Sequence, residues 1–338
     1  MFKHCRAIAS FAALMIAAVC APAQAADFYA GKQITLIVGA PSGGGYDFLA
    51  RLASRHLGKH IPGNPTVVVQ NMPTANSLAA TNHLANVAPR DGTVIAMVQR
   101  GMLLAKIINP NGVQFDIGKL NWLGNLNSET AVVLSWATSP IKVTQDLFDK
   151  EMITGAQTGV DPEISPRLFN ALIGTKFKII TGYPGTTAIG LAMESGEVQG
   201  IADWSWSSLK AQRPEWLRDK KVHVLMQAAL QKDRELPDVP SALDFVRDDV
   251  SRKALELYFT QKTVARPLVA PPDVPADRLE ILRKAVLALA QDKDFLEDAA
   301  RSKLEIDILP AEAVQKVIGM ITNAPPDAVQ KLVRAMGQ

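Results

Sequence analysis

The feature that most constrains this fold is an alternation of short apolar runs with amphipathic segments in the first hundred residues. Helix-like patterns separate three strand-like runs, which cover 33–40, 66–72 and 92–98. This β-α-β-α-β order predicts a parallel, doubly wound sheet with helices on both of its faces. Because such sheets bind ligands at the carboxyl ends of their strands, we expect a binding site in the loop after Ala40.

A second group of strand-like and helix-like segments follows between residues 131 and 226. It begins with the apolar run at 131–136, and several of its later runs end in polar loops that contain glycine. We therefore expect a second α/β lobe. The stretch 264–291 then predicts a strand, a proline-rich turn and a long helix that Pro275 helps to start.

The first 25 residues have the pattern of a secretory signal. Basic Lys3 and Arg6 precede an apolar core, and the small-residue site Ala23-Gln24-Ala25 follows it. We expect cleavage after Ala25 and export of the mature protein. Both cysteines of the chain fall inside this segment, so cysteine catalysis and zinc-thiolate sites are excluded from the mature protein. The 36 basic and 33 acidic residues nearly balance and form no dense basic stripe, which argues against nucleic acid as a partner.

The loop "PSGGGYD" at 41–47 follows the first strand directly. Its three consecutive glycines match neither the dinucleotide fingerprint nor the ATP-type loop, and Asp47 would repel a phosphate. We expect Asp47 to cap the following helix. A helix start preceded by glycines offers free N–H groups that suit a small carboxylate, although the glycines could equally serve only to shape a tight turn.

The sequence lacks the motifs that would indicate a hydrolase or a metal site. It contains neither a G-x-S-x-G nor an H-E-x-x-H motif, and we expect the pair His56 and His60 to lie on a solvated helix face. We therefore expect no enzyme activity, no metal and no cofactor.

Polar clusters end four strand-like runs, where a cleft would lie: Gln99-Arg100, Thr158 to Asp161, Tyr183 to Thr187, and Asp203 to Trp206. A guanidinium at a strand end, such as that of Arg100, can hold a carboxylate bidentately. An exposed or ion-paired arginine is the alternative. Trp204 and Trp206 alternate, so only one of them would face the cleft, unless both pack in the core.

Several of these segments, taken in order, resemble the periplasmic solute receptors of tripartite tricarboxylate transporters, the Bug receptors. The resemblance includes the strand Lys32 to Val38, the loop Pro41 to Asp47 and the helix start Leu49 to Ala53. It continues through 67–73, 85–97, 180–203, 235–245 and 265–286. The chain departs from the family pattern at Pro73 to Asn76, at Gln99-Arg100 and at Val160-Asp161-Pro162.

The resemblance implies a two-lobed periplasmic binding protein of the second structural class, with the ligand closed between the lobes. Its expected lobes are 26–130 with 265–338, and 131–264. It also implies a monomer that captures a small organic carboxylate and delivers it to integral membrane transporter subunits. A receptor that signals to a membrane sensor is the alternative.

Family receptors grip the carboxylate of the solute with loop amides and ordered water. On the first lobe, this implies ligand contacts at Ala40, Ser42, Gly43, Gly44 and Asp47. Thr158, Gly159, Val160 and Asp161 would face them, with Tyr183, Gly185 and Asp203 nearby. Gln99, Arg100 and Trp204 complete the expected site, and the last two would suit a bulkier ligand, either aromatic or bearing a second carboxylate.

Overall fold

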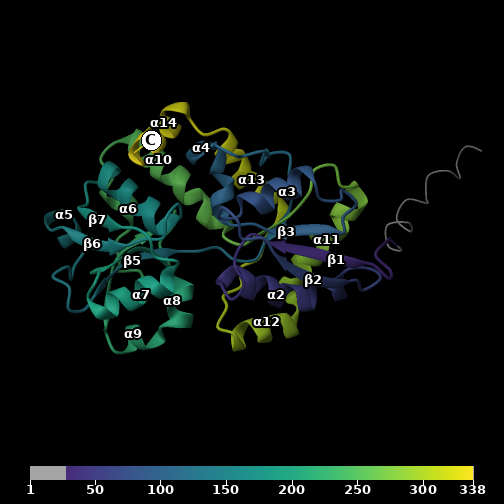
Figure 1. The fold of residues 1–338 in the computed structure, drawn as a ribbon, viewed down its shortest axis with the longest axis horizontal. Helices are drawn as coiled ribbons and strands as arrows, with labels where there is room; N and C mark the ends of the chain where they lie inside the picture. The colour runs from purple at the N-terminus through teal and green to yellow at the C-terminus, as the bar shows by residue number, and fades with distance from the viewer. Residues whose placement is uncertain (1–27, 338) are drawn as a thin grey trace, which may run out of the picture.

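The computed structural model describes residues 28–337, in which the chain forms two α/β lobes around two separate β-sheets (Figure 1). The predicted signal segment lies outside the described residues. None of the described helices is long and apolar enough to cross a membrane.

The first sheet has six strands in the order β11-β4-β10-β3-β1-β2. β1 pairs in parallel with both β2 and β3, as the alternating pattern predicted, while β10 and β11 join in antiparallel fashion and make the sheet mixed. The strand bounds are β1 Gln33–Val38, β2 Thr66–Asn71, β3 Val94–Met97, β4 Asn121–Asn125, β10 Pro267–Ala270 and β11 Leu309–Pro310.

The residues of β1 alternate between the two faces of this sheet. Leu36 and Val38 pack in a core with α2, α11 and α12, whereas Ile37 packs on the other face with α3 and α13. Successive side chains of a strand point in opposite directions, so an apolar run of this kind requires cover on both faces. The helices are α2 Gly45–Leu57, α3 Leu78–Asn86, α11 Ala276–Ala288, α12 Lys293–Arg301 and α13 Ala311–Thr322.

The second sheet has five strands in the order β7-β6-β8-β5-β9 and is also mixed. β6 pairs in parallel with β7 and β8, and β5 pairs in antiparallel fashion with β8 and β9. Their bounds are β5 Ala131–Trp136, β6 Met152–Gly155, β7 Phe177–Ile180, β8 Gly200–Ser205 and β9 Val222–Ala228. β5 and β8 approach closely at Gly200, where a Cβ atom would lie 2.0 Å from the Leu134 carbonyl oxygen.

Helices cover both faces of the second sheet. Val132, Leu134 and Ile201 share a core with α7, α8 and α9, while the opposite face packs with α6, α10 and α14. These helices are α6 Asp161–Leu172, α7 Thr186–Ser195, α8 Trp206–Gln212, α9 Pro214–Arg218, α10 Asp249–Thr260 and α14 Pro326–Ala335.

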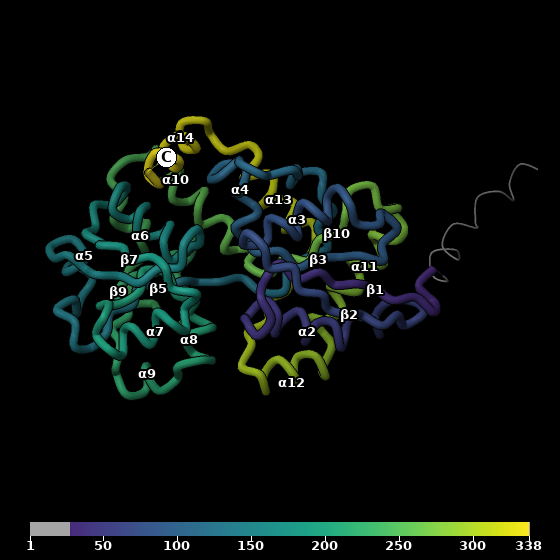
Figure 2. Tube along the Cα trace, viewed as in Figure 1, coloured from purple at the N-terminus to yellow at the C-terminus, as the bar shows by residue number. Residues whose placement is uncertain are grey.

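The chain passes between the lobes more than once. Residues 126–130 lead from β4 to β5, and residues 261–266 lead from α10 back to β10. After α13 has packed on β4 of the first sheet, the terminal helix α14 packs mainly on α10 and α6 (Figure 2). The lobe bounds predicted from the sequence stay a prediction, and α14 is the helix of 265–338 that packs mainly on the second lobe.

Candidate functional site

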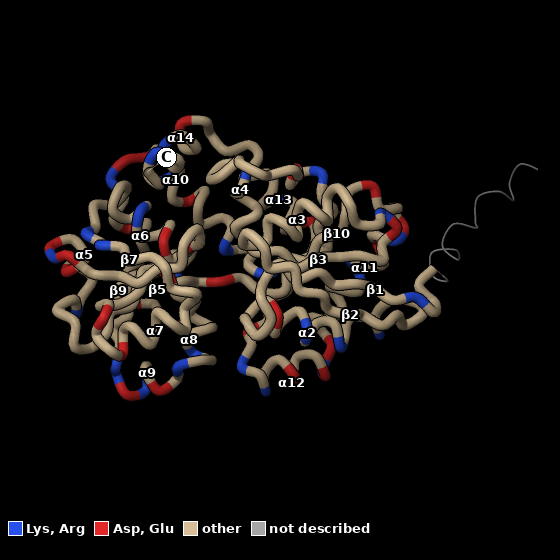
Figure 3. The backbone as a smooth tube through the Cα atoms, in the orientation of Figure 1, with Lys and Arg blue, Asp and Glu red and all other residues tan. Residues whose placement is uncertain are grey.

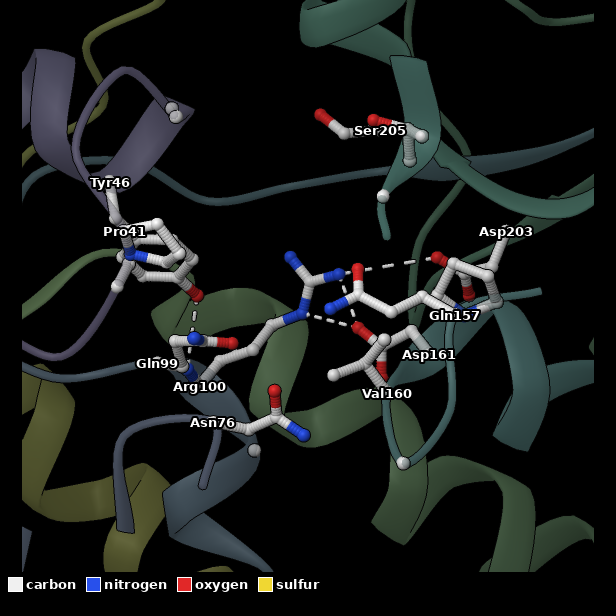
Figure 4. A pocket seen from close by; sticks show the side chains of 18 of the residues that line it. Pro41, Tyr46, Asn76, Gln99, Arg100, Gln157, Val160, Asp161, Asp203 and Ser205 are labelled. Atoms are coloured by element: carbon white, nitrogen blue, oxygen red, sulfur yellow. Dashed lines mark hydrogen bonds and ion pairs between the residues drawn. The ribbon is translucent and has the colours of Figure 1, made fainter. Parts of the chain in front are cut away.

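A cleft of about 920 Å³ lies between the lobes, where strands of both sheets end. Residues 40–46 and 99–102 line it from the first lobe. Residues 159–162, 184–188 and 203–205 line it from the second. Figure 4 shows side chains from both lobes converging on this space. The predicted position of the site, beyond the carboxyl ends of β1 and β3, agrees with this geometry.

Asp47 organises the first-lobe side of the cleft from within α2. The helix begins at Gly45, so Asp47 is its third residue and the prediction that it caps the helix is wrong. Its carboxylate instead accepts the Gly43 N–H at 2.9 Å, the Asn71 amide at 2.9 Å and Arg51 Nε at 3.0 Å. Burial alone would raise the pKa of Asp47, but the bonds from Arg51 and Gly43 outweigh it and lower the pKa.

The second-lobe loop before α6 is held in a similar way. Its Gly159 N–H donates to a Glu163 side-chain oxygen at 2.7 Å, one turn into the helix. The loop also lies close to the first lobe, since a Cβ atom on Gly159 would be 3.3 Å from the Asn76 amide nitrogen. Of the predicted backbone donors, Gly43 and Gly159 therefore already have partners within the chain.

Arg100 reaches from the first lobe to carboxylates of the second lobe (Figure 4) and to Glu129 on the first crossing segment. Its Nε lies 2.8 Å from Asp161, its terminal nitrogens pair with Asp161 and Glu129, and Asp203 lies 4.0 Å away. Its side chain is only 12% exposed. Arg100 is thus an ion-paired arginine, the alternative that the sequence left open.

Lys262 and Arg266, on the second crossing segment, complete the cluster. Lys262 Nζ lies 2.8 Å from Asp203, and Arg266 donates to Glu129 at 2.6 Å. We call Arg100, Glu129, Asp161, Asp203, Lys262 and Arg266 the ion cluster. It contains three cations and three carboxylates, and Figure 3 shows acidic and basic positions where the chain passes between the lobes.

Burial and charge oppose each other at these carboxylates. Burial raises the pKa of Glu129, but Arg266 and Arg100 outweigh it and lower the pKa to about 2. At Asp161 the balance also favours the charged form, since Arg100 and Lys262 overcome burial and lower its pKa. Asp203 differs, because burial and the nearby Asp161 charge raise its pKa despite Lys262.

No family model matches this chain. A curated relative, described as a UPF0065 protein in the TAR-I ttuE-ttuC' intergenic region of Agrobacterium vitis, is 24% identical over 296 residues, which are 85% of this chain and 80% of the relative. A solved TctC solute-binding protein from Polaromonas matches with a TM-score of 0.66 and 17% identity, over 91% of this chain and 98% of that chain.

Two further solved structures superpose similarly. The periplasmic binding protein BugD gives a TM-score of 0.64 at 18% identity, and R. palustris Rpa4515, solved with adipate, gives 0.66 at 19%. Each match covers 91% of this chain and 98% of the other. The chain therefore has the fold of these solute-binding and periplasmic binding proteins. This likeness confirms the predicted two-lobed fold.

In this chain, twelve of the fifteen predicted site residues line the cleft. They are Ala40, Ser42, Gly43, Gly44, Gln99, Arg100, Gly159, Val160, Asp161, Gly185, Asp203 and Trp204. The lining does not include buried Asp47, exposed Thr158 or Tyr183, and Tyr183 donates its hydroxyl to Glu197. Trp204 lines the cleft while packing edge-on against Trp216, whereas the Trp206 indole bonds Glu235.

The sequence did not single out several residues that line the cleft: Tyr46, Asn76, Glu129, Gln157 and Arg266. Tyr46 accepts the Arg100 N–H at its hydroxyl, and its ring lies 4.1 Å from the Arg266 guanidinium. No motif marks Glu129 and Arg266, because they lie on the crossing segments and meet only when both are in place.

We predicted that His56 and His60 lie on a solvated helix face, but His56 lies in the last turn of α2, His60 lies in the 3₁₀ turn that follows, and both contact α12 or its N-cap. His56 is 8% exposed and lies 2.8 Å from Asp298, and His60 lies 2.8 Å from Asp292. These contacts attach α12 to α2. Within residues 28–337, no group of three or more His, Cys, Asp or Glu side chains is arranged to hold a metal ion.

Proposed function

We propose that this protein captures a small organic carboxylate in the periplasm and delivers it, chemically unchanged, to an integral membrane transporter. One observation carries the proposal: helices α2 and α7, from opposite lobes, begin at Gly45 and Thr186, and both of these residues line the cleft. The first N–H groups of a helix have no partner within it, and its N-terminal end carries partial positive charge. Two such ends favour an anion between the lobes.

The contacts of Asp47 indicate which backbone N–H groups of the first lobe remain for the anion. Because Asp47 occupies the Gly43 N–H, we assign the anion to the following amides, beginning with Gly44 and Gly45. We retain Ala40, Ser42, Gln99 and Gly185 as proposed contacts, since they line the same cleft. Lobe closure would then complete the site around the ligand, as in other hinged receptors.

The relatives support the class of ligand and the compartment. Rpa4515 was solved with adipate, a dicarboxylate, and the Polaromonas and BugD structures are of solute-binding and periplasmic binding proteins. The predicted signal segment is consistent with export. The sensory alternative differs only in the membrane partner, so loss of uptake of the ligand after deletion of the gene would favour transport.

Gly45→Pro gives a sharp test of the anion site, because it removes one N–H at the first position of α2. Proline is tolerated at that position, and the preceding Gly44 has φ −92° and ψ 171°, which suits a residue before proline. Loss of one hydrogen bond to a charged ligand costs about 1.5–3 kcal/mol, so affinity should fall by roughly tenfold or more.

Gly45→Ala is the matched control, since it adds a Cβ atom but keeps the N–H. That Cβ atom would lie 3.5 Å from Arg266, which is an ordinary contact. Calorimetric titration with organic acids should give weaker binding for Gly45→Pro than for Gly45→Ala. Equal affinity of the two variants would refute the assignment. Absence of binding to any organic acid, alongside binding of neutral sugars, would refute the function.

A further inference from the structure

We propose that the preferred ligand is a monocarboxylate with an apolar body, rather than a dicarboxylate. This inference rests on the proposed carboxylate-binding function and specifies the rest of the ligand. It follows from two properties of the cleft: its cationic side chains are already neutralised, and one of its walls is apolar.

The cleft offers no free cation for a second carboxylate. Among residues 28–337, Arg100 and Arg266 are the cationic side chains that line it. Arg100 is held by Asp161 and Glu129, and Arg266 by Glu129. Lys262, directly behind, is 1% exposed and pairs with Asp203.

A second ligand carboxylate would also meet like charges. Glu129, Asp161 and Asp203 all line the cleft, so a dianion would have to displace one of them from its cation or lie beside it unpaired. A displaced carboxylate in this buried cluster would lose its partner without regaining water, which is costly. The first carboxylate avoids this penalty because backbone amides at the helix ends receive it.

The apolar wall lies on the chain that follows Arg100. Met102 and Ala105 belong to a buried hydrophobic cluster, and Ile108 and Val113 pack against it while half-buried. Ile164 on α6 extends this surface from the second lobe. We call these five residues the α4 wall, after α4 Ala105–Ile108. They all line the cleft.

The cleft has room for a ligand that contacts both regions. Its volume of about 920 Å³ falls in the range that holds drug-sized ligands, well beyond the size of one carboxylate group. An apolar body against the α4 wall would remove hydrophobic surface from water, whereas a charged end placed there would lose its hydration.

A matched ligand series tests this inference on the full-length mature protein, freed of co-purifying ligand by dialysis from denaturant. Hexanoate and adipate have the same chain length and differ only in the second carboxylate. Calorimetry should give at least tenfold tighter binding of hexanoate than of adipate, and octanoate should bind more tightly still. Tighter binding of adipate than of hexanoate would overturn the inference while leaving the proposed function intact. Failure of every carboxylate to bind would overturn both.

Ile108→Lys provides the complementary test, since it places a cation on the α4 wall at a half-buried position that can reach solvent. The variant should bind adipate at least fivefold more tightly than the parent protein and octanoate more weakly. Leu287→Lys is the control, because Leu287 is 48% exposed on α11 and does not line the cleft. Unchanged preference in Ile108→Lys would overturn the placement of the ligand body.

Discussion

The contact between Arg100 and Asp161 should stabilise this protein far more than an ordinary surface ion pair. The test is a double-mutant cycle of Arg100→Ala, Asp161→Ala and the combined variant. Both side chains are largely buried, at 12% and 13% exposed, so water screens their attraction weakly. Two unit charges about 4 Å apart attract by about 4 kcal/mol at an effective dielectric constant of about 20.

The measured coupling should be smaller than this attraction, because each residue keeps other partners in the single variants. Asp161 retains the Tyr258 hydroxyl and Lys262, which lies 3.8 Å away. Coupling energies for residues in one network typically reach about 0.5–3 kcal/mol, and we expect about 2 kcal/mol here. Arg100→Ala alone should cost about 3 kcal/mol of unfolding free energy, because it leaves Glu129 and Asp161 short of a cation.

Urea unfolding followed by tryptophan fluorescence would measure all four proteins of the cycle, with coincident circular dichroism transitions as the check for two-state behaviour. The control pair is Glu280 and Lys284 on α11, whose side chains are 66% and 74% exposed and should therefore couple only weakly. A coupling for Arg100 and Asp161 no larger than that of the control pair would refute the reasoning.

Three further predictions concern stability. The folded-state pKa of Glu129 is about 2, below its ordinary 4.5, so its ionised form stabilises the fold above pH 4.5 and this contribution is lost as pH falls towards 2. Urea titrations should show that the parent protein loses about 2 kcal/mol more unfolding free energy between pH 5 and pH 3 than Glu129→Gln does. The same dependence of unfolding free energy on pH in both proteins would contradict this. Asp47→Ala leaves the Gly43 N–H without its acceptor and should lower the free energy of unfolding by about 1–2 kcal/mol. A thermal unfolding midpoint equal to that of the parent protein would show that Asp47 does not stabilise the loop. Gly200→Ala places a Cβ atom against the Leu134 carbonyl oxygen and should lower the free energy of unfolding by about 3 kcal/mol. Gly101→Ala is the control, because its Cβ atom would meet nothing within 4 Å. Similar thermal unfolding midpoints for the two variants would contradict the predicted collision.

Local patterns predicted the first lobe well because its first three strands and their helices follow one another along the chain. The apolar runs at 33–40, 66–72 and 92–98 correspond to β1, β2 and β3, which pair in parallel. The antiparallel partner β10 was not predictable in the same way. It enters the sheet between β3 and β4 from a distant part of the sequence, and no local periodicity encodes that pairing.

The site shows the same division between local and distant information. The rule for strand ends correctly brought Gln99, Gly159 and Asp203 to one cleft. The sequence also suggested Arg100 as a counter-ion for a second ligand carboxylate. In the structure its carboxylates come from the chain itself, at positions 29 and 61 residues away. A residue type at a strand end therefore predicts proximity to the site but not which partner it has.

The path of the chain offers a way to test the proposed lobe closure. The described chain begins beside β1 in the first lobe and ends on α14, which packs on helices of the second lobe (Figure 1). Its two ends thus lie on different lobes. A donor fluorophore at one end and an acceptor at the other would convert lobe closure into a change of energy transfer, without any label in the cleft.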